Sequence, residues 1–130
     1  MIIYLESSAA TKLLLREPET PAMRDFLNGF AAEGHAVVSS QLVETELRRA
    51  AQRAGASQAA ATAVLDRLDL LDVDRSTFAA AGLLPDPLLR SLDALHVASA
   101  MRVSADIFVT YDDRQTTAAH RAGLHVVSPV

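Results

Sequence analysis

Apolar residues along this chain form short unbroken runs, which alternate with longer segments where apolar positions recur every three or four residues. The runs at residues 1–5 and 107–109 are rich in β-branched and aromatic side chains, which is typical of strands. Because no polar residue interrupts these runs, we expect strands that are covered on both faces, as in a parallel sheet. Further short strands are predicted at residues 36–38, 70–74 and 125–127.

The segments of helical spacing predict helices between these strands. Residues that begin or end helices separate them, for example Pro18, Pro21 and Gly34. The helices are expected at residues 9–16, 21–32, 41–53, 58–68, 76–84, 91–101 and 114–121. Strands that alternate with helices predict a single α/β domain over residues 1–130, with three α/β/α layers and a mainly parallel central sheet of about five strands.

Composition allows this domain a core of its own, because hydrophobic residues make up 50% of the 130 positions. The chain has no cysteine, which excludes structural disulfides and cysteine-ligated metals. No apolar run approaches the ~20 residues that span a bilayer, and Glu6 ends the first run too early for a signal peptide. We therefore expect a cytoplasmic protein that does not contact a membrane.

Charge narrows the function classes further. The formal net charge is −4 and the pI is about 5.5, so the chain lacks the broad basic footprint of a typical nucleic-acid binder. Eleven of its twelve cationic residues are arginine, with Lys12 the exception, and arginine suits bidentate contacts to phosphate. An enzyme that touches nucleic acid through a metal and a few arginines remains compatible with this composition.

Four acids stand where the folding pattern does not require them. Glu6 and Asp112 follow two predicted strands, Glu46 lies on the apolar stripe of its helix, and Asp93 opens another helix. Ligands bind beyond the carboxyl ends of parallel strands, so these acids can converge at one edge of the sheet. Converging carboxylates repel unless a cation is present. An all-oxygen set suits Mg²⁺ or Mn²⁺ better than Zn²⁺, and such an ion equips a site for phosphodiester hydrolysis.

Five segments occur in an order that resembles a known family: residues 3–9, residues 38–40 with 43–50, and residues 89–100, 108–114 and 122–129. Together they cover nearly the whole chain, and Leu92-Asp93-Ala94-Leu95-His96 is the most specific piece. In this order they resemble PIN-domain proteins, and among these the VapC-like ribonuclease toxins of VapBC toxin–antitoxin systems.

The resemblance implies a PIN-like fold and metal-dependent cleavage of structured RNA of the tRNA or rRNA class. It also implies a homodimer, a cognate VapB-like antitoxin that covers the acidic site, and a larger toxin–antitoxin complex. Ser7 matches a small hydroxyl residue beside the first acid. By position, the Mg²⁺ or Mn²⁺ ligands of the family fall on Glu6, Glu46, Asp93 and Asp112, with Asp113 as an additional ligand or neighbour.

Glu6 departs from the family pattern, in which the first acid is usually aspartate. Glutamate is one methylene longer, so its carboxylate has to fold back or shift the metal by up to ~1.5 Å, a C–C bond length. Because Mg²⁺ is strict about octahedral geometry, Glu6 favours Mn²⁺ or a bridging water. The departure also supports an alternative function, a PIN module that binds RNA or antitoxin without cleaving.

Each acid alone also has a structural interpretation. Glu6 and Asp93 lie where an acid favours a helix dipole, and Glu46 is a candidate to pair with an arginine. Asp112 and Asp113 fit a turn and helix cap. A phosphotransfer domain of receiver or phosphatase type is a further alternative, which we rank low because no aspartate nucleophile follows the first strand.

Other polar patterns are interpreted as structural. The histidines lack zinc-ligand spacing, and His96 is expected in the core or beside the site. Residues 72–74 are interpreted as the end of a strand rather than as a phosphatase D-x-D motif. The run that contains Arg48, Arg49 and Arg53 is expected on a solvated face, with contact to RNA phosphate or antitoxin as the alternative. Arg114 is a candidate to steady the leaving oxygen in the cleavage reaction.

Overall fold

Five parallel strands form the centre of the computed structural model, which describes all residues from 1 to 130. Their order across the sheet is β3-β2-β1-β4-β5, so β1 is central. Strands β2 and β3 are added on one side of β1, and β4 and β5 on the other, so the strand order reverses between β1 and β4. This confirms the predicted parallel sheet of five strands. The strands are β1 (Ile2–Leu5), β2 (Ala36–Ser40), β3 (Asp69–Leu71), β4 (Ile107–Val109) and β5 (Val126–Val127).

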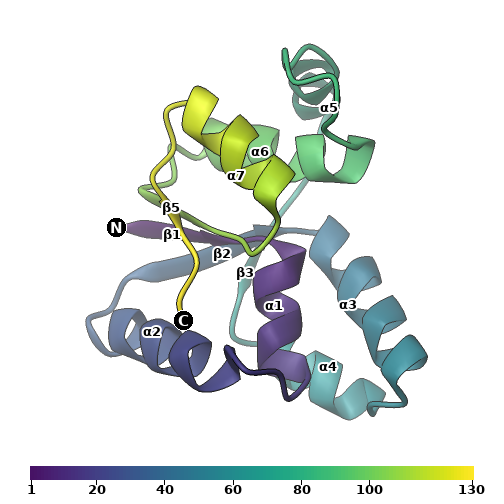
Figure 1. The fold of residues 1–130 in the computed structure, drawn as a ribbon, viewed down its shortest axis with the longest axis vertical. Coiled ribbons are helices and arrows are strands. Elements are labelled where there is room, and N and C mark those ends of the chain that lie inside the picture. The colour runs from purple at the N-terminus through teal and green to yellow at the C-terminus, as the bar shows by residue number, and fades with distance from the viewer.

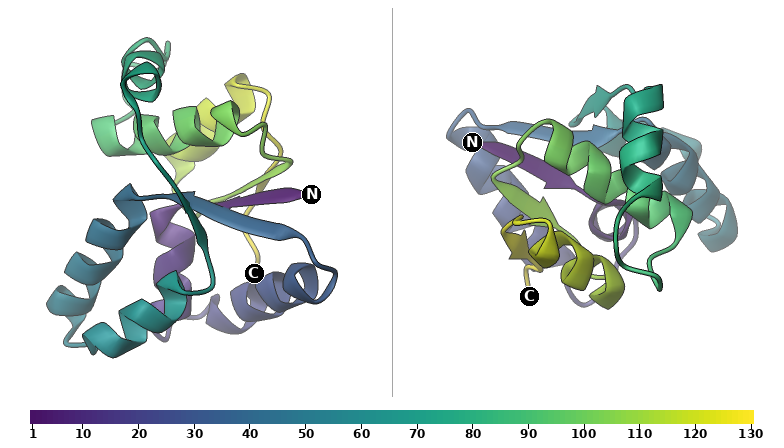
Figure 2. Two further views of the ribbon diagram at one scale, coloured as in Figure 1. Left: turned by 180° about the vertical axis from the view of Figure 1, so that it is seen from behind. Right: turned by 90° about the horizontal axis from the view of Figure 1, so that it is seen from above.

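Helices cover both faces of the sheet and complete three layers (Figure 1). One face carries α1 (Ser7–Leu14), α2 (Thr20–Ala32), α3 (Leu42–Ala54) and α4 (Gln58–Leu65). The other carries α6 (Ser91–Arg102) and α7 (Asp113–Arg121). Helix α5 (Arg75–Gly82) packs on α6 and lies at the outer end of the molecule, at the top of the left view of Figure 2. All of these helices are too short or too polar to cross a bilayer.

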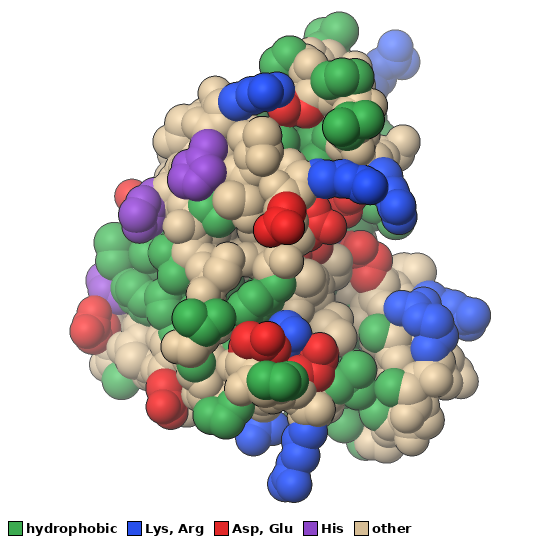
Figure 3. All heavy atoms as spheres, in the orientation of Figure 1, with side chains coloured by type: hydrophobic (Ala, Val, Ile, Leu, Met, Phe, Trp, Pro, Cys, Tyr) green, Lys and Arg blue, Asp and Glu red, His purple; other side chains and the backbone are tan.

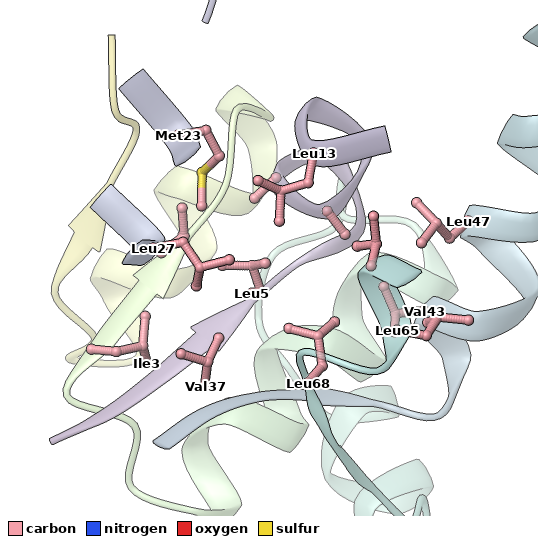
Figure 4. Packing of buried hydrophobic residues seen from close by; sticks show 14 of the residues in the cluster. Ile3, Leu5, Leu13, Met23, Leu27, Val37, Val43, Leu47, Leu65 and Leu68 are labelled. Carbon is pink, nitrogen blue, oxygen red and sulfur yellow. The ribbon is translucent and has the colours of Figure 1, made fainter. Parts of the chain in front are cut away.

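The side chains of β1 explain why its sequence is apolar without interruption. Successive residues of a strand point to opposite faces. Ile3 and Leu5 enter a cluster of 17 buried residues with α1 to α4, as Figure 4 shows, and Tyr4 enters a cluster of nine with α6 and α7. Fully burying each aliphatic side chain contributes about 1.5–3 kcal/mol, so both faces of β1 hold the layers together.

Several element boundaries differ from the sequence prediction for local reasons. β2 extends to Ser40 because Ser39 and Ser40 are buried and pair with β3. β3 ends at Leu71 rather than residue 74, since the Asp74 side chain accepts from the backbone N–H of Thr77 and caps α5. Residues 72–74 therefore lie beyond the strand, and Asp74 serves as a helix cap.

Candidate active site

The carboxyl ends of β1 and β4 lie side by side and bring two of the predicted acids together. Leu5 pairs with Val109 in the sheet, and the backbone N–H of Glu6 donates to the carbonyl of Val109 at 3.1 Å. Asp112 follows at the start of α7, as its N-cap residue. The strand order changes direction at this point, which is where parallel α/β folds place their ligands.

Two helices from opposite layers add the other two acids. Glu46 lies in the second turn of α3, and Asp93 lies in the first turn of α6. Two adjoining hollows, each of about 430 Å³, share Glu46, Asp93 and Asp112, and the second is also lined by Glu6. We call these two hollows together the acidic groove. The four acids that the sequence singled out therefore line one groove.

Asp113 and the arginines lie around this groove in different ways. Asp113 is exposed at the first residue of α7 and lines neither hollow. Arg90 and Arg114 line the first hollow, and Arg49 and Arg53 line the second. Figure 3 shows acidic side chains gathered between two groups of Lys and Arg side chains. Arg49 and Arg53 are exposed, as expected for a solvated face, and they also line the groove.

Glu6 is held by hydroxyl groups and is almost fully buried, with 2% of its surface exposed. Its Oε1 accepts from Ser7 Oγ at 2.6 Å, and its Oε2 accepts from Ser8 Oγ and from Thr110 Oγ1 at 2.8 Å. The longer glutamate side chain is thus accommodated with its carboxylate folded among three hydroxyls. Sequence reasoning identified Ser7 but missed Ser8 and Thr110.

Glu46 pairs with a histidine rather than an arginine. Its Oε1 lies 2.6 Å from Nε2 of His96, and its Oε2 accepts from Ser7 Oγ at 3.0 Å. Arg48, the neighbouring candidate, instead bonds Glu44 at 3.1 Å on the solvent side of α3. His96 is fully buried, which confirms its expected place in the core beside the site.

The far side of His96 meets Tyr4, whose hydroxyl lies 2.7 Å from Nδ1 of the ring. The backbone N–H of Ser40 donates to the same hydroxyl at 3.1 Å. Burial raises the pKa of Tyr4 to about 12, so its hydroxyl stays protonated at neutral pH.

Gln115 connects the two aspartates of the groove. Its Nε2 donates to Asp93 Oδ1 at 2.7 Å, and its backbone N–H donates to Asp112 Oδ1 at 2.9 Å. Asp112 therefore caps α7, as its structural interpretation predicted, and lines the groove as well. Sequence reasoning missed Gln115, although glutamine three residues after an N-cap is a recognisable capping signal.

The surroundings of Asp93 in the groove destabilise its ionised form. Burial raises the pKa of Asp93 above its usual range, and the charges of Asp112 and Glu6 raise it further. A bound cation would relieve this repulsion. The groove supplies carboxylate and hydroxyl oxygens as donors, a hard set that fits Mg²⁺ or Mn²⁺. No three acidic or histidine side chains lie close enough together to form a ready-made ion cluster.

Comparison with known proteins places this chain in a family. The PIN domain model matches residues 3–121, which include all four groove acids. The chain therefore belongs to the PIN domain family, as its sequence resemblance predicted.

Within that family, its relatives are VapC proteins. It is 44% identical to Ribonuclease VapC46 of Mycobacterium tuberculosis over 131 residues, which cover 98% of this chain and 97% of that protein. Ribonuclease VapC47 of the same species is 36% identical over 132 residues, with the same coverage.

Two solved complexes share the fold. VapBC2 from Rickettsia felis, bound to a DNA fragment from its promoter, contains a chain that superposes with a TM-score of 0.76 at 18% identity, with full coverage of both chains. VapBC-1 from nontypeable Haemophilus influenzae gives a TM-score of 0.70 at 14% identity, covering 98% of each chain. At these identities the likeness concerns the fold alone.

Proposed function

We propose that this chain is a metal-dependent endoribonuclease that serves as the toxin of a type II toxin–antitoxin module in the cytoplasm. The observation that carries this proposal is that four carboxylates, from two strand ends and two opposite helical layers, line one groove. The relatives named Ribonuclease VapC support the activity. Family membership alone would not assign it, since one fold hosts several functions.

The proposed ligands of Mg²⁺ or Mn²⁺ are the four groove acids, with Asp113 as an additional, weaker candidate because it is exposed outside the hollows. When bound, a divalent cation polarises a phosphoryl oxygen and lowers the pKa of a water molecule. The Ser7 hydroxyl lies 2.6 Å from Glu6 Oε1 and 3.0 Å from Glu46 Oε2, so the two carboxylates share its single hydrogen on the same side of the groove. The ligand set is Glu6, Glu46, Asp93 and Asp112.

Arginines on both sides of the groove are the proposed contacts to the RNA backbone. The arginines that form ion pairs in this chain are Arg48, Arg102 and Arg121. The four at the groove form no ion pair, so their guanidinium groups are free to bind phosphate bidentately. Arg114 lies beside Asp112 and is the proposed partner of the leaving oxygen.

The proposed substrate is structured RNA of the tRNA or rRNA class, cleaved in a loop where the strand is unpaired. An open groove lined by polar side chains can admit a single strand, and proteins recognise RNA mainly at such unpaired segments. The proposed partners are a VapB-like antitoxin that covers the groove and a second copy of the chain, joined in a larger complex. The structural neighbours are themselves VapBC complexes, which supports the antitoxin.

A second candidate function is a PIN module that binds RNA or antitoxin without cleavage. The burial of Glu6 favours it, since both oxygens of this carboxylate already accept hydrogen bonds from hydroxyls. If Glu6 stays in that position, three carboxylates remain to hold the ion.

The test is cleavage of total RNA by the purified protein with Mn²⁺ and with EDTA. Asp93→Asn is the site variant, and Asp25→Asn, the same change on the exposed side of α2, is its matched control. Discrete fragments that require metal, persist in the control and vanish in Asp93→Asn support the nuclease. Intact RNA in every reaction, with RNA binding retained, favours the second candidate.

A further inference from the structure

A chain of hydrogen bonds leads from the end of β2, through the core, to the acidic groove. The backbone N–H of Ser40 donates to the Tyr4 hydroxyl, which meets Nδ1 of His96 at 2.7 Å, and Nε2 of His96 meets Glu46 Oε1 at 2.6 Å. Tyr4 and His96 are both fully buried. Neither lines a hollow of the groove, so both lie behind it.

The available donors and acceptors indicate in which direction each hydrogen bond of this series runs. Tyr4 already accepts from the N–H of Ser40, so its own hydroxyl hydrogen is available for Nδ1 of His96. An accepting Nδ1 places the ring proton on Nε2, which then donates to Glu46. In this arrangement every donor is used once, and the backbone N–H of Ser40, which is fixed in the sheet, favours this tautomer of the histidine.

The rings in the chain are also fixed by packing. Tyr4 stacks on Phe108, with centroids 5.4 Å apart and planes 8° apart. It meets His96 edge-on, at 5.8 Å and 74°. Ser40 pairs with Leu71 in the sheet. A donor that is held this firmly can orient a flexible carboxylate, because its own rotamer is locked.

We infer that His96, held by Tyr4, is a positioning residue for Glu46. It occupies Oε1 and turns Oε2 toward Ser7 and the groove. Glu46 belongs to α3 on one face of the sheet, and His96 belongs to α6 on the other, so this bond also ties the two helical layers across the groove. The inference rests on the proposed function, in which Glu46 is a metal ligand.

A purely structural role makes a different prediction. A histidine that only fills the core contributes to stability, and its loss leaves metal affinity unchanged. A histidine that orients a ligand carboxylate changes metal affinity typically 10–100-fold when it is removed. Metal binding in the absence of RNA therefore separates the two roles without reference to cleavage.

The experiment is calorimetric titration of Mn²⁺ into the full-length protein, alongside thermal unfolding of each variant. His96→Leu removes the donor, and His96→Gln retains an N–H near the position of Nε2. Tyr4→Phe frees the ring to adopt the other tautomer while leaving His96 and Glu46 in place. Glu46→Gln, alone and combined with His96→Leu, completes a double-mutant cycle.

We expect His96→Leu to weaken Mn²⁺ binding by about 10-fold or more, with partial recovery in His96→Gln and an intermediate loss in Tyr4→Phe. In the Glu46→Gln background, His96→Leu should change the remaining affinity by less than about twofold, because its effect passes through Glu46. If His96→Leu does not fold, Tyr4→Phe and His96→Gln supply the same comparison.

Two results would overturn the inference. One is wild-type Mn²⁺ affinity in the His96 and Tyr4 variants, and the other is an equal loss with and without Glu46. A wild-type protein that binds no Mn²⁺ would instead overturn the proposed function, and the inference with it. A wild type that binds, a Glu46→Gln variant that binds weakly and a His96→Leu variant that binds normally would overturn the inference alone.

Discussion

Gln115 Nε2 lies 2.7 Å from Asp93 Oδ1 and joins α7 to α6 inside the acidic groove. Gln115 is fully buried, and its Oε1 has no hydrogen-bond partner. A buried acceptor without a partner costs about 1–3 kcal/mol, and a hydrogen bond to a charged group contributes about 1.5–3 kcal/mol. The two effects of this side chain on folding stability therefore nearly cancel.

Gln115→Leu should thus leave the free energy of unfolding within ~1 kcal/mol of the wild type, while it loosens Asp93 and weakens Mn²⁺ binding. Gln115→Glu places a carboxylate against Asp93 and should destabilise the fold more than leucine at pH 7, because like charges repel. Urea unfolding at pH 7 checks the order of the two variants. A more stable glutamate variant would contradict this account of Gln115.

Asp93→Asn should change stability in opposite directions without and with metal. The pKa of Asp93 is raised in the folded protein, so its stabilising contribution is present at low pH and lost as the pH rises through that pKa. Asparagine removes the charge, so it should raise the melting temperature at pH 7 in EDTA. Saturating Mn²⁺ should stabilise the wild type but not this variant. Equal Mn²⁺ shifts in both proteins would place the ion elsewhere.

Asp74 gives a pH dependence that is independent of the groove. The backbone N–H of Thr77, together with hydroxyls of Ser76 and Thr77, lowers the pKa of Asp74 to about 2. Its stabilisation of α5 is therefore present above the unfolded pKa of ~3.9 and lost as the pH falls toward 2. Asp74→Asn keeps the cap oxygen without the charge. It should unfold at lower urea than the wild type at pH 7, and this gap should narrow as the pH falls from about 4 to about 2.

The groove arginines should control RNA affinity and its salt dependence together. Replacing Arg90 or Arg53 by glutamine removes one phosphate contact, which should reduce the slope of log affinity against log salt concentration by about 0.7 for single-stranded RNA. Arg24→Gln, on the exposed side of α2, is the matched control. Filter binding measures the RNA affinity of each arginine variant at several salt concentrations, with Asp93→Asn added to each variant to prevent cleavage. If the salt slopes of the Arg90 and Arg53 variants match that of the control, these arginines do not contact the RNA backbone.

The positions of the groove acids could be predicted from the sequence, because the backbone of the strands and helices determines where these residues lie. Glu6 and Asp112 follow strands that a parallel sheet sets side by side, and Glu46 stood out as an acid on an apolar stripe. Asp93 was singled out as the acid of the first turn of a helix, and the most specific segment of the family resemblance contains it. The five strands and seven helices were also predictable, because their apolar periodicity is strong.

Apart from Ser7, which lies next to Glu6 in the sequence, most partners of those acids were not predicted, because they depend on side chains that meet across the fold. Thr110 reaches Glu6 from 104 positions away, and His96 reaches Glu46 from 50 positions away. Both look ordinary in their own segments, a threonine after a strand and a histidine in a packed helix. Only the geometry of the folded chain shows which carboxylate each of them contacts.

The dependence of RNA cleavage on Mn²⁺ concentration tests the central claim most directly. The rate should be zero in EDTA, rise with Mn²⁺ and saturate for the wild type and Asp25→Asn. Single amide variants of Glu46, Asp93 and Asp112 should need more Mn²⁺ or lose cleavage, and Glu6→Gln should show whether the buried carboxylate turns to the metal. Cleavage by the wild type in EDTA, or equal Mn²⁺ curves for all of these variants, would contradict a metal-dependent nuclease at this groove.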